Sequence, residues 1–467
     1  MIEQFTKASI PMKSQISGRL SSLNEEPICS GEYVLYWMQA SQRTRFNPAL
    51  EHAVKRADEL KLPLLAAFGL MDNYPEANER HYAFMLQGLA DVKGGLADRG
   101  IGFVIRHGSP PRVALELAEH AATIVCDRGY LRHQKQWRDQ VADEAGCCVE
   151  QVEGDVVVPV EEASDKSEFA ARTLRPKIHR VLDRYLKPCR SLKLNVRRPR
   201  WKMSSDIDLS DIPGALAKLK IDRTVKQVAH FHGGEIEAQR CLRHFLKHSL
   251  NGYRDGRNEP AGDMTSTLSP YLHFGQVSPV EIALRVQSSH APTRDKEPFL
   301  EELVVRRELA MNFVNFNPNY DSYNVLPAWA QRTLRAHATD QRPYIYIRSD
   351  LENAQTHDRF WNAAQRQMTV TGHMHNYMRM YWGKKVLEWK RTPREAYEDL
   401  IYLNNRYFLD GRDPASWANV GWIFGLHDRP WQQRPIFGTV RYMNDSGLQR
   451  KFDMEAYVRK VDALESD

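Results

Sequence analysis

Three tryptophans in the last third of the chain could carry single electrons. Trp382 and Trp389 lie seven residues apart in HMHNYMRMYWGKKVLEW (373–389), so on a helix their Cα atoms would be roughly 10 Å apart along one face. Trp361 lies in the preceding helical segment, HDRFWNAAQ. Indole rings so placed can pass an electron in single steps, but apolar residues at this spacing are more often a core stripe. The spacing alone favours the core stripe.

A glutamate in FLEELVVRREL (299–309) could act on a carbonyl group. Glu302 and Arg306 are four residues apart, the spacing of an ordinary surface ion pair on a helix. Glu302 also falls on the side of Val305 and Leu309, which would partly bury it and favour its protonated form. Such a carboxyl can donate a hydrogen bond to a carbonyl that gains an electron. The helix by itself favours the ion pair.

Small hydroxyl side chains gather at Thr265, Ser266, Thr267 and Ser269, directly before a segment that can form a helix. Backbone N–H groups and the helix dipole at such a turn can hold a phosphate. An ordinary series of helix N-cap residues is the alternative, and the motif alone favours it.

Tryptophan and arginine are unusually dense in the C-terminal loops. Residues 402–444 carry them without long apolar runs, and base stacking with phosphate contact would use such a set. Loop packing with solvated charge explains it equally well. The residues are Trp417, Trp422, Trp431, Arg429, Arg434 and Arg441.

The N-terminal half supplies short apolar runs that alternate with helical segments, the pattern of a doubly wound parallel sheet in a Rossmann-like α/β domain. It has no G-x-G-x-x-G after its first strand and no P-loop, so ordinary dinucleotide and NTP binding lose support. The loop MQASQRTRFNPAL that follows the first strand is a weak candidate for ligand binding at a strand's carboxyl end. The predicted strands are 33–38, 62–70, 100–108, 122–127 and 149–159.

These patterns predict four regions along the chain. Residues 1–30 form an N-terminal tail, 31–185 the α/β domain, 186–230 a basic interdomain linker, and 231–467 a domain that is entirely α-helical. Helical segments in the last region are separated by Gly, Pro and Asp loops, and no internal repeat is present.

Composition sets the class of protein. The 467 residues are 42% hydrophobic and 27% charged, which is typical of a soluble globular protein. No 18-residue run lacks charge, which excludes a membrane span, and the N-terminus lacks a secretory signal. Six cysteines without C-x-x-C spacing indicate neither a metal site nor a disulfide framework and fit a cytoplasmic protein. The net charge of +6 only slightly favours a polyanionic partner.

Together these segments resemble the class II cyclobutane pyrimidine dimer photolyases of the photolyase/cryptochrome family. The resemblance runs from about Tyr33 to Tyr457, and its motifs occur in order, so coincidence is negligible. The motifs are TLSPYLHFGQ (267–276), FLEEL with RREL (299–309), WNAAQ (361–365), MHNYMRMYWGKKVLEW (374–389), LNNRY with LDGRDP (403–414), HDRPW (427–431) and VRYM with RKFD (440–453).

The resemblance implies non-covalent FAD, folded into a U-shape inside the helical domain. Asn404 matches the asparagine that faces flavin N5 and stabilises reduced forms. Trp382, Trp361 and Trp389 match an electron relay, in that order from flavin to surface. The remaining positions that match flavin-binding residues are Tyr253, Thr265, Ser266, Thr267, Leu268, Ser269, Arg379, Asp410 and Asp413.

The same resemblance implies a partner, DNA that carries ultraviolet-induced pyrimidine dimers, bound with the dimer flipped out of the stack. Excited FADH⁻ donates an electron, both cyclobutane C–C bonds split, and Glu302 stabilises the dimer radical anion through a C4 carbonyl. Arg429 and Trp431 match the loop that fills the gap left in the duplex. The other substrate-contacting matches are Arg257, Asn258, Met380, Trp422 and Arg441.

Two positions depart from the pattern, Arg306 in place of a tryptophan and Met311 in place of an acidic residue; neither touches the flavin or the relay. A photosensor of the cryptochrome type, with FAD but without repair, is the main alternative. The short chain after the last motif and the retained Glu302 favour repair. A flavin-containing nucleic-acid-binding protein is a remote third reading. The resemblance also implies a monomer and allows an antenna such as 8-hydroxy-5-deazaflavin, without assigning its residues.

Overall fold

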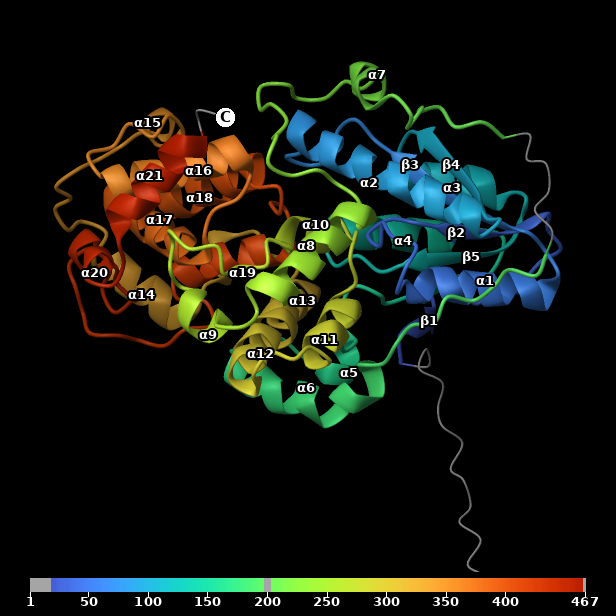
Figure 1. Cartoon of the computed structure of the whole chain (residues 1–467), viewed down its shortest axis with the longest axis horizontal. Coiled ribbons are helices and arrows are strands. Elements are labelled where there is room, and N and C mark those ends of the chain that lie inside the picture. Colours follow the sequence, from blue (N-terminus) through green and yellow to red (C-terminus); the bar gives the residue numbers. More distant parts are fainter. Residues whose placement is uncertain (1–17, 197–202, 465–467) are drawn as a thin grey trace, which may run out of the picture.

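The computed structural model describes residues 18–196 and 203–464, which form an α/β part and a helical part that lie side by side (Figure 1). Three stretches of the predicted regions fall outside the described residues: 1–17 of the tail, 197–202 of the linker and the last three residues. In the described part, no helix is long and apolar enough to cross a lipid bilayer.

The α/β part is built on a six-stranded sheet in the order β1-β6-β5-β2-β3-β4. Strands β2 to β6 are parallel, with Leu35 opposite both Leu65 and Ile124, as the alternating pattern predicts. The strands are β1 (Leu20–Ser22), β2 (Tyr33–Trp37), β3 (Leu64–Leu70), β4 (Gly102–His107), β5 (Ala121–Asp127) and β6 (Val149–Val152).

Two details of the sheet differ from the prediction. β1, within the stretch assigned to the tail, adds an antiparallel edge strand against β6. β6 ends at Val152 rather than at residue 159, because the guanidinium of Arg19 draws the following chain aside. It donates to the carbonyl oxygens of Glu153, Val156 and Val157 at 2.6–3.1 Å. Those carbonyls are therefore not available to a neighbouring strand.

Helices cover both faces of the sheet, since alternate residues of each strand point to opposite sides. Val34, Tyr36 and Ala66 pack with helices α1 and α2, whereas Leu35 and Ala67 pack with α3 and α4. The bounds are α1 (Pro48–Leu60), α2 (Glu79–Asp98), α3 (Pro110–Ala118) and α4 (Arg132–Glu144).

The helical part contains no strand within its described residues, although an isolated bridge joins Arg434 and Gly438. Its helices that position the site are α8 (Glu235–His248), α9 (Tyr253–Gly256), α10 (Ser269–His273), α11 (Pro279–Gln287), α12 (Thr293–Leu300), α13 (Arg307–Phe316), α16 (Arg359–Thr371), α17 (Asn376–Trp389), α18 (Pro393–Tyr407) and α19 (Pro414–Ile423). The remaining helices are α14 (Ala328–Ala336), α15 (Arg348–Glu352), α20 (Asp445–Gln449) and α21 (Met454–Leu464), with a short 3₁₀ turn at Tyr323–Val325.

The chain between the sheet and the helical part carries α5 (Val160–Ala163), α6 (Ala171–Tyr185) and α7 (Ile212–Ala217). Leu174 and Ile178 of α6 share a core with residues of α8, α11 and α12, and Figure 1 shows α5 and α6 beneath α11 and α12. Residues 160–185, which the sequence analysis groups with the sheet, thus pack with the helical part. The apolar face of α6 packs against α8, α11 and α12 of that part.

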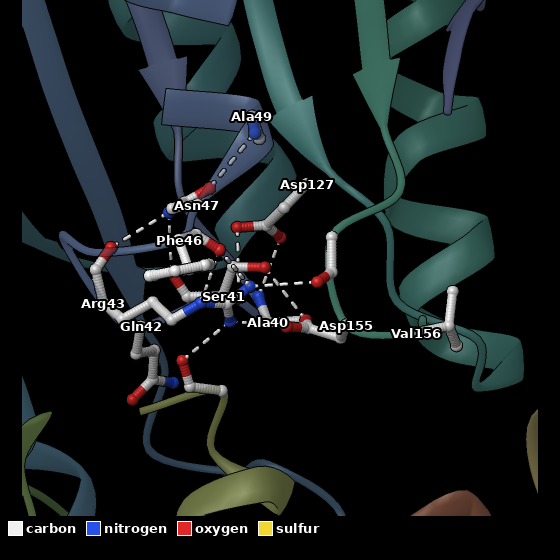
Figure 2. A network of polar contacts seen from close by, with 12 residues as sticks. Ala40, Ser41, Gln42, Arg43, Phe46, Asn47, Ala49, Asp127, Asp155 and Val156 are labelled. Atoms are coloured by element: carbon white, nitrogen blue, oxygen red, sulfur yellow. Dashed lines mark hydrogen bonds and ion pairs between the residues drawn. The ribbon is translucent and has the colours of Figure 1, made fainter. Parts of the chain in front are cut away.

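A buried polar network holds the loop after β2 (Figure 2). The carboxylate of Asp127, at the end of β5, accepts hydrogen bonds from the backbone N–H groups of Gln39, Ala40 and Ser41 at 2.8–3.2 Å. Asn47 caps α1 by accepting from two backbone N–H groups, both at 3.1 Å. The network fixes the loop against the carboxyl ends of the strands.

Arg43, in the same loop, ties the two parts of the molecule together. Its fully buried guanidinium lies 2.6 Å from Asp155 and donates to the carbonyl oxygen of Gly275 in the helical part at 2.9 Å. Nearby, the carboxylate of Glu235 in α8 accepts from the backbone N–H and hydroxyl groups of Thr44 at 2.9 and 2.8 Å. The arginine and asparagine that marked this loop as a candidate ligand site therefore serve the architecture.

We expect Asp155→Ala to lower the free energy of unfolding by about 3–5 kcal/mol, because it leaves the Arg43 charge buried without its partner. Glu116→Ala is the matched control, since it breaks the exposed Arg112–Glu116 pair and should cost less than about 0.5 kcal/mol. Urea unfolding followed by circular dichroism measures both. Equal stability losses in the two variants would contradict the structural role of Arg43.

Candidate functional site

Polar side chains from three elements meet inside the helical part. Asp410, in the turn between α18 and α19, is ion-paired with Arg379 of α17 at 3.0 Å and hydrogen-bonded with Ser269 of α10. Burial acts to raise the pKa of Asp410, but the charge of Arg379 and the hydrogen bond from Ser269 outweigh it, so the pKa lies below its usual value. The guanidinium of Arg379 also lies 3.8 Å over the Phe408 ring. We call Arg379, Asp410 and Ser269 the polar cluster.

Other predicted flavin-binding residues surround this cluster or serve local structure. Thr267 has a left-handed backbone (φ 52°), and Leu268 is buried beside it. Tyr253 packs edge-on against the Phe299 ring at 5.4 Å. Asp413 caps α19 through the backbone N–H of Ala415 and lies 3.3 Å from a ring nitrogen of His273. Thr265, Ser266 and Asn404 are half-buried, half-buried and buried respectively.

These groups fit a flavin dinucleotide. Within the described part of the chain, the half-buried Thr265 hydroxyl has no hydrogen-bond partner. Hydroxyl groups and unpaired donors suit phosphates, while a guanidinium–carboxylate pair and a buried amide suit the polar edge of a heteroaromatic ring. The donor set therefore matches the group that the sequence motifs imply.

The three predicted relay tryptophans are connected and almost fully buried. Trp382 donates its indole N–H to Gln365 at 2.8 Å, and Trp361 donates to the backbone carbonyl of Trp382 at 3.0 Å. The Trp361 and Trp389 rings lie 5.4 Å apart, centroid to centroid. Trp382 also lies 6.3 Å from Phe408, which joins this chain to the polar cluster. This arrangement is compatible with both interpretations of the three tryptophans, a core stripe and an electron relay.

The outer end of the chain differs from the expectation. Trp389 is 1% exposed and is covered by the rings of Tyr346 and His357 at 5.3 and 5.4 Å, so it does not itself reach the surface. An i, i+7 spacing fixes which face of α17 holds the ring. It carries no information about the loop that covers that face.

Glu302 lies in a π-helical turn (Glu301–Arg306) between α12 and α13. Its carboxylate pairs with Arg257 at 3.1 Å and its side chain is 40% exposed, so it is not packed into the core with Val305. Arg306 pairs with Glu301 instead, at 3.2 Å, because residues five apart come together in a π turn. The ion pair expected from α-helical spacing, Glu302 with Arg306, is therefore wrong.

A pocket at the molecular surface collects four of the predicted substrate-binding residues, Met380, Trp422, Trp431 and Arg441. The guanidinium of Arg441 lies 5.1 Å from the Trp422 ring and 4.1 Å from the Trp431 ring. Asp428 accepts from Arg441 at 3.1 Å and from the indole N–H of Trp431 at 3.3 Å. We call this arrangement the cation–ring stack.

Three further predicted substrate residues do not line this pocket. Arg429 extends the stack, with its guanidinium 5.1 Å from the Trp431 ring. Arg257 and Asn258 follow α9, and Arg257 faces Glu302. The predicted residues thus form two groups, the Arg257–Glu302 pair and the pocket with its stack.

The sequence analysis missed the lysine beneath the stack. Lys384 of α17 is fully buried, donates to the carbonyl oxygen of Ile423 at 2.5 Å and lies 5.3 Å from the Trp422 ring. Burial lowers its pKa to about 7, and Asp428 only partly opposes this. The sequence does show a lysine among the apolar residues of the helix that carries Trp382 and Trp389. The prediction for this helix was based on the spacing of the two tryptophans and did not consider the lysine.

A second pocket lies between the two parts of the molecule, at the carboxyl ends of β2 and β3. It is largely apolar and aromatic, and the helical part closes it with His273, Phe274 and Arg412. A crevice at the carboxyl ends of strands is the usual place for a ligand in such a sheet. From the α/β part its lining includes Met38, Gln39, Ala40, Gln42, Tyr74 and Trp137.

Comparison with known proteins gives consistent matches along the chain. The family model described as DNA photolyase matches residues 34–194. A deoxyribodipyrimidine photo-lyase of Methanothermobacter thermautotrophicus is 48% identical over 450 residues, covering 96% of this chain and 98% of that protein. The proteins of the same name from Potorous tridactylus and from rice (Oryza sativa subsp. japonica) are 41% and 40% identical. They cover 91% and 93% of this chain, and 81% and 88% of their own lengths are matched.

Solved structures support the fold. A bacterial class III photolyase from Agrobacterium tumefaciens superposes with a TM-score of 0.73 at 21% identity, over 92% of this chain and 86% of that one. An archaeal photolyase from Sulfolobus tokodaii with two FAD molecules gives 0.68 at 17% identity, over 91% and 89%. At these identities the likeness concerns the fold alone, and it agrees with an α/β part joined to a helical part.

We expect stability to rise with pH between about pH 7 and pH 10 through Lys384, by about 1.4 kcal/mol per pH unit. In this window the folded protein holds the amine neutral while the unfolded chain protonates it, so unfolding takes up a proton. Lys384→Met should remove that slope and stabilise the protein near pH 7, whereas Lys247→Met on the exposed face of α8 should not. Melting temperatures measured at pH 7, 8 and 9 test this pH dependence of stability. Parallel profiles for wild type and Lys384→Met would show that the amine stays charged in the folded protein.

Proposed function

The chain belongs to the DNA photolyase family, and on this premise we propose that it splits cyclobutane pyrimidine dimers in DNA with the energy of absorbed light. The observation that carries this is similarity over almost the whole length to a deoxyribodipyrimidine photo-lyase. The same span holds the polar cluster, the tryptophan chain and the surface pocket. The reaction class is a light-driven carbon–carbon lyase.

FAD supplies the photoexcited electron when it is bound. Arg379, Asp410 and Ser269 would hold it, together with Asn404, in the interior between α10, α17 and α18. This assignment is supported by the ion pair, which places one cation and one carboxylate at a half-buried point without net charge. The phosphate-holding segment would be Thr265–Ser269 with Tyr253, where the Thr265 hydroxyl is free to donate.

The lesion would enter through the surface pocket. Met380 and Trp422 offer apolar and aromatic surface to the two joined bases of a dimer that has left the stack, while Arg257 and Glu302 offer paired polar groups to its carbonyl edges. Glu302 would hydrogen-bond a carbonyl of the dimer as that carbonyl gains charge, after which both cyclobutane C–C bonds break and the electron returns. Extrusion is less costly for a dimer than for intact bases, because a dimer stacks and pairs poorly.

The cation–ring stack would meet the DNA. Arg441 and Arg429 supply charge for phosphates, and Trp431, which is 38% exposed, supplies a face for stacking where the dimer has left the duplex. The Asp428 carboxylate keeps Arg441 in place, so the stack is arranged before DNA arrives. Pre-arrangement of this kind lowers the entropy lost on binding.

In addition to FAD, we propose that the protein holds a light-harvesting second chromophore. We place it in the pocket between the two parts, because that pocket is apolar, aromatic and at the carboxyl ends of β2 and β3. The Sulfolobus tokodaii photolyase is described as having two FAD molecules, with the implication of a novel light-harvesting cofactor. A flat chromophore such as 8-hydroxy-5-deazaflavin suits the aromatic lining here.

The photosensor alternative has less support. It shares the polar cluster and the tryptophan chain, but it has no need of a carboxylate–guanidinium pair such as Arg257–Glu302 or of an open aromatic pocket for bases. The curated relatives that align over most of this chain are named as repair enzymes.

The proposed function is tested by illuminating the chemically reduced protein with an oligonucleotide that contains one thymine dimer. We expect dimers to disappear under blue light and to persist in the dark. Glu302→Gln should lower the yield of repair per absorbed photon severalfold and leave FAD binding intact, while Glu301→Gln, in the same turn, should repair normally. Persistent dimers in illuminated, FAD-loaded wild type would favour the photosensor.

Trp361→Phe should abolish photoreduction of oxidised FAD but spare repair by protein that has been reduced with dithionite. The phenylalanine keeps the packing of α16 against α17 but is much harder to oxidise than indole. Trp417→Phe, a buried tryptophan outside the chain of three, is the control and should photoreduce normally. Absorption spectra during illumination report both, and normal photoreduction in Trp361→Phe would require another electron route.

A further inference from the structure

The last turn of α18, which carries Asn404, is held by side chains from the α/β part of the molecule. A helix leaves its final carbonyl groups without partners inside the helix. Here three consecutive carbonyl oxygens at the end of α18 receive donors from the start of α2: Asn78 to Arg406 at 2.8 Å, Arg80 to Tyr407 at 2.6 Å and His81 to Phe408 at 3.0 Å. The direction of the His81 bond follows from its other nitrogen, which accepts from the backbone N–H of Asn78.

A fourth side chain from the same segment reaches further. Glu76 lies in the loop before α2 and accepts a hydrogen bond from the side-chain amide nitrogen of Asn405 at 2.5 Å. Asn405 is fully buried, and its amide oxygen accepts from the backbone N–H of Arg412 at 2.9 Å and from the side chain of Asn404 at 3.0 Å. Glu76 has a left-handed backbone (φ 59°), a conformation that a residue other than glycine keeps only when its surroundings hold it there.

These contacts determine which way each amide points. A backbone N–H can only donate, so the atom of Asn405 that faces Arg412 is its amide oxygen, and the amide nitrogen faces Glu76. Asn404 can then present only its nitrogen to Asn405. Its carbonyl oxygen is left over, and among the described residues no donor to that oxygen is present.

We propose that Glu76 is a positioning residue for the flavin site: acting through Asn405, it holds the Asn404 amide with its carbonyl oxygen available to the flavin ring. The inference rests on the proposed function and deepens it, because it places an α/β-domain residue in control of a group beside the cofactor. A carbonyl oxygen can only accept, so it favours a ring that carries an N–H over one that offers a lone pair. The reduced form of the flavin is the form with that N–H.

The test compares the FAD-loaded full chain of wild type, Glu76→Gly and Glu76→Gln. Glycine removes the carboxylate but suits the left-handed backbone, and Asn78, Arg80 and His81 stay in place, so the variant should fold. We expect the ratio of reduced to oxidised FAD at a fixed applied potential to fall about tenfold in Glu76→Gly, the effect of losing one hydrogen bond that the Asn404 carbonyl makes only to the reduced ring. Glutamine retains an acceptor oxygen and should restore most of the ratio.

Glu79→Ala is the matched control, because Glu79 lies in the first turn of α2 but contacts Gln227 and Lys226 rather than α18. Dye-equilibrated redox titration gives the ratio, and thermal melting separates it from a loss of fold. Should Glu76→Gly fold poorly, Glu76→Asn, which also tolerates this backbone but is one methylene shorter, takes its place with the same expectation. A folded variant that binds FAD with an unchanged ratio overturns the role of Glu76 and leaves the proposed function standing. Wild type that binds no FAD overturns both.

Discussion

The arrangement depends on charges that are buried where the two parts of the molecule meet. Arg43 and Arg80 are almost inaccessible to water, and each donates to carbonyl oxygens of the helical part: Arg43 to Gly275, and Arg80 to Tyr407 at the end of α18 and to Met368 and Thr369 of α16. A buried guanidinium without acceptors is strongly destabilising, so these contacts tolerate little relative movement. The carboxyl edge of the sheet is consequently an interface and a ligand pocket at once. His81 and Arg412 both line that pocket and bear on the turn that carries Asn404, so the two proposed chromophore sites share a wall.

The surface pocket is organised by the balance between cation–ring attraction and cation–cation repulsion. From the interior outward, cations and rings alternate: Lys384, Trp422, Arg441, Trp431 and Arg429. Each ring face attracts the cation beside it, but neighbouring cations repel one another, and only Asp428 lies within the stack to offset them. Burial relieves part of the repulsion by lowering the pKa of Lys384. The stack thus keeps its positive charge at the exposed end, where DNA phosphates would approach, and leaves the interior end close to neutral.

Sequence patterns could predict what depends on neighbours in the chain. The buried strands follow from apolar runs, and the polar cluster and the surface pocket follow from motifs that the structure brings together. Glu302 shows where local reasoning fails: a π turn replaces the α-helical spacing on which the pairing with Arg306 was based. The covering of Trp389 depends on a loop that ends more than thirty residues earlier. Glu76 and Asn405 are 329 residues apart, and neither segment contains a pattern that predicts their contact. The sequence of a single chain carries no signal for such contacts.

The polar cluster must exchange electrons and exclude water if it holds a flavin, and these two requirements explain where the tryptophan chain lies. A cofactor site that must exchange electrons but exclude water needs dry, rigid surroundings, and α16, α17 and α18 supply these with buried aromatic residues. Electrons must still cross that layer. Phe408 touches both Arg379 and Trp382, and each of the next two indoles is held by a hydrogen bond or a ring contact, so the path crosses the core without a polar channel. In the proposed relay, the same rings that seal the interior against water would also carry electrons across it.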